Sequence, residues 1–199
     1  IVVFGAYTGW LLWENNQADT AAAASDIYEE ILTLAFSTTE GEAISEADGD
    51  QIISYAEQLM AEYNGTMYAR YAALYAAQQY VRRDDLQAAA NALQWVLDLV
   101  GSEMCIRDRD NPLEGLFAES DPGLELTATL RLGRILLAQG QAEQALSLIG
   151  SVDPQGYEAG YAELRGDIYL EMERLQDARE AYIAAQQAGS SSDALRMKL

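Results

Sequence analysis

The first residues of the chain, IVVFGAYTGWLLW, are uncharged and apolar on every helical face, and the chain turns polar at Glu14. An ordinary surface helix keeps one polar face, so this run differs from it. Helical residues 1–13 would span about 20 Å, short of the roughly 30 Å hydrocarbon core of a membrane. Trp10 and Trp13 lie at its end, as in the aromatic belts that meet lipid headgroups. We interpret residues 1–13 as the C-terminal part of a truncated transmembrane helix; a buried core helix and a cleaved signal peptide are the alternatives.

The segment after this run also has a helical pattern. Residues 14–36 continue the helix as an Ala-rich stretch without Pro or Gly. Residues 37–49 read as a loop, and the next apolar stripe predicts a helix over 51–63. Asp48 or Asp50 is its expected N-cap, because a short polar side chain can accept a bond from a free backbone N–H.

Three later segments repeat one order of small and large residues. Gly133 and Gly166 lie 33 residues apart, and each is followed at the same intervals by a large residue, an alanine and a second large residue. The following residues occupy those positions in the two segments: Leu136, Ala145 and Ile149, then Tyr169, Ala178 and Tyr182. An earlier segment fits the same frame with Ala77, Tyr80, Ala89 and Leu93. A small residue lets two antiparallel helices approach closely, and a large one on the same face fills the space beside it.

Short polar linkers join the two helices of each predicted pair. The linkers RDD at 83–85 and QGQ at 139–141 have the right length for an αα-hairpin. One hairpin cannot bury its own apolar face, so hairpins stack into a solenoid. The sequence therefore predicts an all-α fold, a tetratricopeptide-repeat-like solenoid of antiparallel helix pairs over 48–199, after a juxtamembrane helix and loop at 14–47. A generic Ala-rich helix bundle is the alternative.

The first and second repeats are separated by extra residues at 100–122. Ala77 and Gly133 lie 56 residues apart, which is 23 more than the 33-residue period. Within the insertion, the string GSEMCIRDR resembles a translated sequencing-adaptor remnant; a functional loop between hairpins is the other interpretation. Cys105, the single cysteine, falls in this string, and the chain has no histidine to activate it as a nucleophile.

The charge and composition of the chain argue against several classes of function. The formal net charge is −20 and the pI is about 4.1, so phosphate backbones are repelled and nucleic-acid binding is not expected. The absence of histidine removes the commonest general base and metal ligand. We expect no metal, cofactor, small-molecule substrate or enzymatic activity. A hydrolase or metal enzyme is the alternative class, and it would need converging carboxylates in a deep pocket.

Charge also predicts the topology. Residues 14–69 contain twelve acidic and no basic residues, and the first basic residue of the chain is Arg70. Under the positive-inside rule, a flanking segment without basic residues is translocated to the outer side of the membrane.

The repeated segments resemble the tetratricopeptide repeat, and the third segment matches it best. In that family, fixed positions of the first helix line a concave groove. Carried onto this frame, those positions give the predicted partner contacts: Tyr71, Gln78, Arg82, Thr127, Arg134, Glu163 and Asp167. Tyr71 also belongs to an aromatic stripe with Tyr68 and Tyr75, for which core packing and a peptide-contact surface are both open interpretations.

Longer stretches are similar to the ancillary SecYEG translocon subunits of proteobacteria, the YfgM-like family. They are GWLLWENNQADTAAAASDIYEEIL, YARYAALYAAQQYVRRDDLQAAANALQWVL, ATLRLGRILLAQGQAEQALSLI and, most specifically, LRGDIYL followed by DAREAY. The resemblance implies one inner-membrane helix anchored in the lipid bilayer, with the bulk of the chain in the periplasm. It also implies association with the SecYEG translocon and a periplasmic prolyl-isomerase-like chaperone. A periplasmic repeat scaffold for cell-envelope or outer-membrane assembly is the alternative function.

Overall fold

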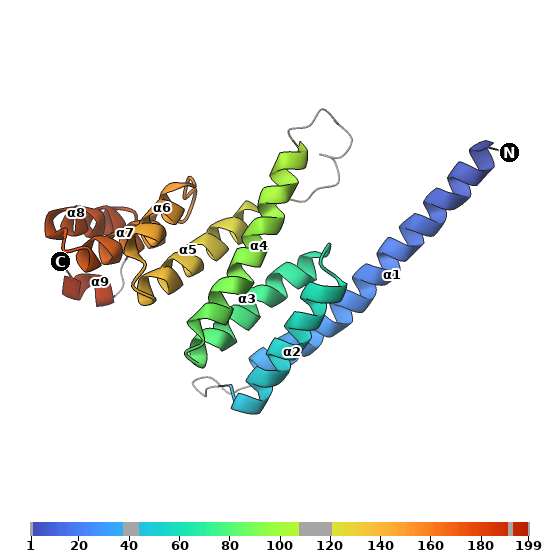
Figure 1. Cartoon of the computed structure of the whole chain (residues 1–199), viewed down its shortest axis with the longest axis horizontal. Coiled ribbons are helices and arrows are strands. Elements are labelled where there is room, and N and C mark those ends of the chain that lie inside the picture. Colours follow the sequence, from blue (N-terminus) through green and yellow to red (C-terminus); the bar gives the residue numbers. More distant parts are fainter. Residues whose placement is uncertain (1, 38–43, 108–120, 191–192, 199) are drawn as a thin grey trace. The chain divides into compact units, whose positions relative to one another are not determined.

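The described part of the chain is helical throughout. The computed structural model describes the backbone of residues 2–37, 44–107, 121–190 and 193–198, and the side chains of 18–37, 44–101, 121–190 and 195–198. Every regular element within these ranges is an α-helix (Figure 1), which confirms the predicted fold class. The chain divides into two compact units, unit 1 (Ile1–Arg83) and unit 2 (Asp84–Leu199), which are described separately.

Unit 1 is built from three helices that contact one another. They are α1 (Val2–Phe36), α2 (Glu46–Glu62) and α3 (Met67–Arg82). Ala24 and Ile31 of α1 are fully buried, as are Ile52 and Leu59 of α2. The C-terminal half of α1 is therefore part of the core of unit 1. The sequence predicted a helix over 14–36, but only as a continuation of the membrane helix.

The start of α2 differs from the expectation. The helix begins at Glu46, inside the predicted loop, and its N-cap is Ser45 rather than Asp48 or Asp50. The Ser45 hydroxyl accepts a bond from the Asp48 backbone N–H at 3.1 Å and donates to the Asp48 carboxylate at 2.6 Å. The first of these bonds is an N-cap bond, and it satisfies an otherwise free backbone donor of the first turn. The predicted N-cap was therefore wrong.

Polar contacts fasten α3 to α2. Arg83, at the C-terminal end of α3, pairs with Asp50 at 2.5 Å and donates to the backbone carbonyl of Glu46 at 3.2 Å. Further along the two helices, the Tyr80 hydroxyl donates to Glu57 at 2.6 Å. These contacts join the C-terminal end of α3 to α2, and the two helices form an antiparallel hairpin.

Unit 2 contains the other six described helices. They are α4 (Leu86–Arg107), α5 (Pro122–Ala138), α6 (Ala142–Gly150), α7 (Glu158–Glu171), α8 (Leu175–Gln187) and the short α9 (Asp193–Lys198). Helices α5 and α6 form one hairpin, α7 and α8 another, and α4 packs along α5 (Figure 1). These two hairpins coincide with the second and third predicted repeats. The positions of the first repeat are shared between the units, with Ala77 in unit 1 and Ala89 and Leu93 in unit 2, and all three are buried.

The small residues of the repeat lie where helices meet closely. A Cβ atom on Gly166 would lie 2.3 Å from the Tyr182 ring on α8. A Cβ atom on Gly133 would lie 3.0 Å from both Ile149 on α6 and Leu164 on α7. Ala145 and Ala178 are also buried, at 0% and 2% exposure. The prediction that small residues mark the close crossings is confirmed for Gly133 and Gly166.

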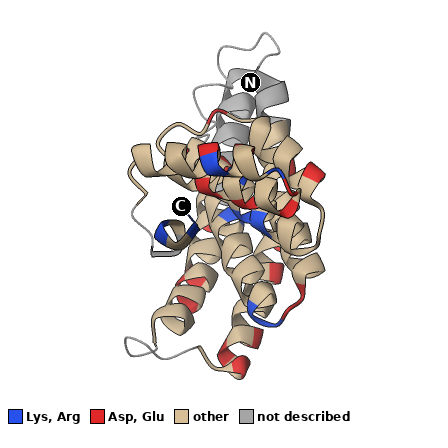
Figure 2. Cartoon of the chain, turned by 90° about the vertical axis from the view of Figure 1, so that its left-hand side faces the viewer, with Lys and Arg blue, Asp and Glu red and all other residues tan. Residues whose placement is uncertain are grey.

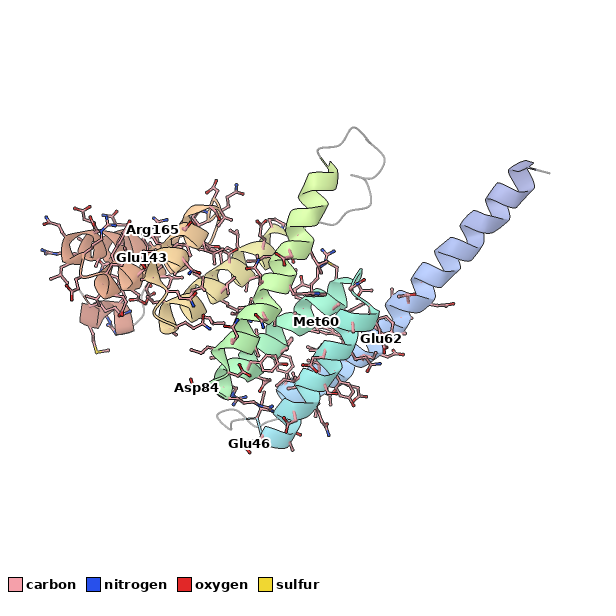
Figure 3. The ribbon with its side chains drawn as sticks, in the orientation of Figure 1. Glu46, Met60, Glu62, Asp84, Glu143 and Arg165 are labelled. Carbon is pink, nitrogen blue, oxygen red and sulfur yellow. The ribbon has the colours of Figure 1, made fainter. Side chains whose placement is uncertain are left out.

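The same backbone turn ends the first helix of each repeat. Asp84, Gly140 and Glu173 have positive φ angles of 61°, 74° and 59°, and Asp84 is labelled at its turn in Figure 3. The N–H groups of Gly140 and of the following Gln141 close a Schellman motif after α5, with bonds of 2.9 and 2.8 Å. Those of Glu173 and Arg174 do the same after α7, with bonds of 3.0 and 2.8 Å. Gly140 and Glu173 lie 33 residues apart, so the repeat extends to the backbone conformation of its turns.

Two predicted segments are described only in part. No helix within the described residues is both long and apolar enough to cross a membrane. The side chains of residues 1–13, the predicted half-span, are not among those described, so that prediction is not tested. In the insertion at 100–122, α4 continues to Arg107, and residues 108–120 lie outside the description.

Candidate protein-binding surface

Three predicted contact residues belong to α3 in unit 1. Gln78 and Arg82 are exposed, and Arg82 donates a long bond of 3.5 Å to the buried side chain of Gln79. Tyr71 is half-buried and packs inward on α1. Two of the three side chains are thus accessible on unit 1, and the third takes part in its packing.

Tyr71 is one of four tyrosines that gather around α1. The ring centroid of Tyr28 lies 5.7 Å from that of Tyr68, 6.5 Å from Tyr71 and 6.2 Å from Tyr75. The tilted and edge-on geometries are those that aromatic pairs prefer. The stripe on α3 therefore packs against α1, and we refer to these four residues as the tyrosine cluster.

Burial in this cluster changes the chemistry of Tyr28. Burial raises the pKa of Tyr28 to about 12. Electrostatic repulsion from Tyr75, a hydrogen bond with Tyr75 and repulsion from Tyr71 contribute in the same direction. The hydroxyl therefore stays neutral at physiological pH, as a packing group should.

Two predicted contacts belong to α5 in unit 2. The Thr127 hydroxyl donates to the Tyr157 hydroxyl at 3.3 Å and is half-buried. Arg134 is exposed. Next to Thr127, the buried Tyr161 donates its hydroxyl to the Leu126 carbonyl at 2.9 Å, which ties α7 to α5.

The last two predicted contacts, on α7, already have partners in the chain's own C-terminal segment. Glu163 accepts a bond from Ser190 at 3.3 Å. Asp167 accepts the Tyr182 hydroxyl at 2.7 Å and forms an ion pair with Lys198 of α9. Burial, with the hydrogen bond and charge of Asp167, raises the pKa of Tyr182 far above its usual value.

Apolar packing holds α9 on the same hairpin. Leu195 is 1% exposed and packs with Ala162, Ala178 and Ala185, and the Lys198 ammonium lies 5.4 Å from the centre of the Tyr182 ring. The face of α7 that carries Glu163 and Asp167 is therefore largely covered within the chain.

The seven predicted residues thus divide between the two units. Three lie on α3 in unit 1; the other four lie on α5 and α7 of unit 2, two helices that contact each other. The exposed members are Gln78, Arg82 and Arg134. These three are the best positioned of the set to touch another protein.

A second feature of unit 2 is a hollow that the repeat pattern did not predict. Helices α4 and α6 form its walls and α5 its floor, and its volume is about 550 Å³. We call this hollow the amide groove, because most of its polar lining residues carry side-chain amides. The main lining residues are the amides Gln87, Asn91, Gln94 and Gln144, the hydroxyl residue Ser147, and the leucines Leu132, Leu136 and Leu148. None of the lining residues described in the structure carries a charge.

One signal in the sequence could have indicated this groove. Gln87, Asn91 and Gln94 recur at intervals of four and three residues, the spacing of one helix face. A row of uncharged amides is unusual on a chain with 32 acidic and 12 basic residues. The second wall could not be found this way, because it comes from a different helix about fifty residues away.

The electrostatic character of the described helices is acidic. Acidic side chains are spread over both units, and basic ones are fewer (Figure 2). Among the side chains that the structure describes, no group of three or more potential metal ligands comes together.

Comparison with known proteins agrees with this architecture. The profile of a family described as "Tetratricopeptide repeat-like domain" matches residues 1–105 and 111–199. The "Ancillary SecYEG translocon subunit" of Escherichia coli K12 is 33% identical over 193 residues, which are 97% of this chain and 77% of that protein.

The chain belongs to the ancillary SecYEG translocon subunit family. Two further proteins of that name support the assignment of this family member. The one from Haemophilus influenzae is 27% identical across the whole chain and 83% of its own length. The one from Aggregatibacter actinomycetemcomitans is 26% identical across the whole chain and 82% of its own length. No solved structure matches this family member.

Proposed function

We propose that this chain is an ancillary subunit of the Sec translocon that binds other proteins through its helical repeats and catalyses no reaction. The observation that carries the proposal is the match to a relative with this name over 97% of the chain. The helix pairs of unit 2 support it, since stacked hairpins of this kind present rigid side chains to protein partners.

The second part of the proposal concerns location. The apolar run at 1–13 is the C-terminal part of a single transmembrane helix that anchors the chain in a bacterial inner membrane, and the bulk of the chain lies in the periplasm. The polarity change at Glu14 and the absence of basic residues before Arg70 support this orientation.

The third part concerns the partners. The translocon is one partner, and a periplasmic prolyl-isomerase-like chaperone is the second, so that the chain links the two. An acidic chain suits partners with basic or amphipathic faces, because opposite charge speeds encounter. The exposed residues Gln78, Arg82 and Arg134 are the proposed points of contact.

Site-specific photo-cross-linking in bacterial membranes tests the proposal. A photoreactive amino acid is placed at Gln78, Arg82 or Arg134, and in the control at Gln187, an exposed residue of α8. We expect cross-links to translocon subunits and the chaperone from the first three positions and weaker ones from the control. Fractionation should recover the protein with the inner membrane.

Three outcomes would contradict the proposal. Recovery in the soluble fraction, without any translocon cross-link, of the chain extended before Ile1 to a complete transmembrane helix would remove the export-site function. Cross-links to cell-envelope or outer-membrane assembly proteins alone would favour the scaffold function. A reporter fused after Lys198 and active only in the cytoplasm would reverse the topology.

A further inference from the structure

The amide groove has the chemistry of a site for peptide backbone. Each Asn or Gln side chain carries one carbonyl acceptor and one NH₂ donor group, the same pair that a peptide unit presents. Gln87 donates to Asn91 at 3.0 Å, a bond that leaves the carbonyl oxygen of Gln87 and the NH₂ group of Asn91 for a ligand. On the opposite wall, Gln144 and Ser147 are exposed on α6.

The spacing of the amides fits an extended chain. Along α4, the intervals from Gln87 to Asn91 and from Asn91 to Gln94 correspond to about 6 Å and 4.5 Å of helix rise. An extended strand repeats its backbone groups every two residues, about 6.6 Å. The first interval is close to this repeat, so a strand along α4 can meet both Gln87 and Asn91. Gln94 donates its NH₂ group to Asp98 at 2.8 Å and offers a ligand its carbonyl oxygen. A helix has its backbone groups already bonded and would leave these amides without partners.

The floor of the groove favours a ligand with apolar side chains. Leu132 is almost fully buried, while Leu136 and Leu148 are half-buried and offer part of their surface to the groove. A volume of about 550 Å³ lies inside the roughly 300–1,000 Å³ of ligand sites. The floor thus accepts apolar side chains from one face of a strand, and the amides hold its backbone.

The lack of charge sets the groove apart from the rest of the molecule. The chain has a net charge of −20, yet the lining contains no carboxylate that would select a basic segment. The contacts predicted from the repeat frame include Arg134, Glu163 and Asp167, all charged and all on first helices of the hairpins. The groove uses α4 and α6 as its walls, and so is a different site.

We propose that the amide groove binds an extended, uncharged polypeptide segment with leucine-like side chains on one face. Amides of α4 and α6 bond its backbone, and the leucines of α5 and α6 take its apolar side chains. This site goes beyond the proposed function, and its affinity does not depend on whether the chain resides at the translocon.

Fluorescence anisotropy with the purified full chain tests the site. The probe is a labelled, terminally blocked peptide in which leucine alternates with asparagine and serine; two matched peptides replace the polar positions with lysine or glutamate. Asn91→Ala and Gln144→Ala should each weaken binding of the uncharged probe by roughly three- to tenfold. Ser147→Trp, which fills the groove from an exposed position, should abolish it. Gln187→Ala, on α8 and outside the groove, is the matched control and should bind as the parent does.

The outcomes separate this site from general attraction to an acidic protein. Binding of the uncharged probe that persists at high salt and falls only in the groove variants supports the proposal. Absence of uncharged-probe binding, equal weakening by Gln187→Ala, or binding of the lysine peptide alone with loss in salt overturns it. Circular dichroism confirms that each variant is folded. Because the assay contains no membrane, failure here leaves the cross-linking test of the proposed function unaffected.

Discussion

Unit 1 adds a cluster of four tyrosine rings between α1 and α3 to its alanine-rich core, whereas unit 2 has glycines at the close crossings of its helices. In unit 1, Tyr28 of α1 is ringed by three tyrosines of α3 with centroids 5.7–6.5 Å away. In unit 2, Gly166 leaves so little room that a Cβ atom would overlap the Tyr182 ring. Aromatic rings keep two helices further apart and provide a large apolar contact area, while small residues let the two backbones approach closely.

The difference matters for what each unit does. Unit 1 contains the helix that continues from the proposed anchor, and its aromatic packing couples that helix to α3. Unit 2 repeats one hairpin geometry and forms the amide groove between neighbouring helices. Substitutions that exchange the two packing modes should therefore break one unit at a time.

The largest effect is expected at Gly166 in unit 2. Gly166→Val forces two helices apart, because even the first added carbon would lie 2.3 Å from the Tyr182 ring. We expect the free energy of unfolding to fall by roughly 3 kcal/mol. Urea titration followed by circular dichroism measures it.

Gly150 supplies the matched control. It ends α6, and a Cβ atom there has no neighbour within 4 Å. Gly150→Ala should leave stability unchanged or raise it by up to about 1 kcal/mol. Equal losses from both substitutions would refute the close crossing at Gly166.

The next effect is expected at Tyr28 in unit 1. Tyr28→Ala removes the ring that the three tyrosines of α3 surround and should cost about 2 kcal/mol, less than for a fully buried aromatic residue. Tyr28→Phe keeps the ring and should cost less than about 1 kcal/mol. If the two variants lose the same stability in urea, the ring contacts are not what holds α1.

Alkaline pH sharpens the same test. Burial raises the pKa of Tyr28 from 10.0 to about 12, so the folded state keeps a proton that the unfolded chain releases. The stabilisation is complete below about pH 10 and is lost as pH rises through about 12. Tyr28→Phe should reduce this decline between pH 10 and 12; an unchanged pH profile would show that other groups cause it.

The smallest effect is expected in the turn between α7 and α8. Glu173 has a φ of 59°, a conformation that costs an ordinary side chain about 1–2 kcal/mol and glycine very little. Glu173→Gly should raise the free energy of unfolding by about 0.5–1 kcal/mol after the entropy cost of glycine. Gly140→Ala, at the equivalent turn 33 residues earlier, should lower it by about 1 kcal/mol. Thermal unfolding of both variants measures whether stability rises or falls. If both substitutions change stability in the same direction, the two turns are not equivalent.

Much of the fold was predictable because it depends on local sequence. The spacing of Gly133, Ala145, Gly166 and Ala178 predicted which residues lie at the close crossings, and the structure buries all four. The linkers at 83–85 and 139–141 predicted the turns. The cap of α2 was not predicted correctly, since Ser45, Asp48 and Asp50 are all good capping residues and only the register of the helix chooses among them.

The candidate sites were less accessible to sequence reasoning. The repeat frame named Tyr71, Glu163 and Asp167 as partner contacts, but it could not show that Tyr71 packs on Tyr28 or that Ser190 and Lys198 return to α7. It also gave no account of the amide groove, whose walls come from α4 and α6, two helices far apart in the sequence. Such contacts depend on residues distant in the chain and on helix rotation, which single-helix periodicity does not specify.

By itself, the sequence determined the helical class, the 33-residue period, the small residues at the crossings and the acidic charge, because each depends on intervals within one or two neighbouring helices. The tertiary structure alone decided that α1 joins a tyrosine cluster, that α9 covers the acidic face of α7, and that uncharged amides of α4 and α6 face one hollow. The physical reason is that periodicity fixes which face of a helix is apolar, while the partner of that face is fixed only when all the helices pack together.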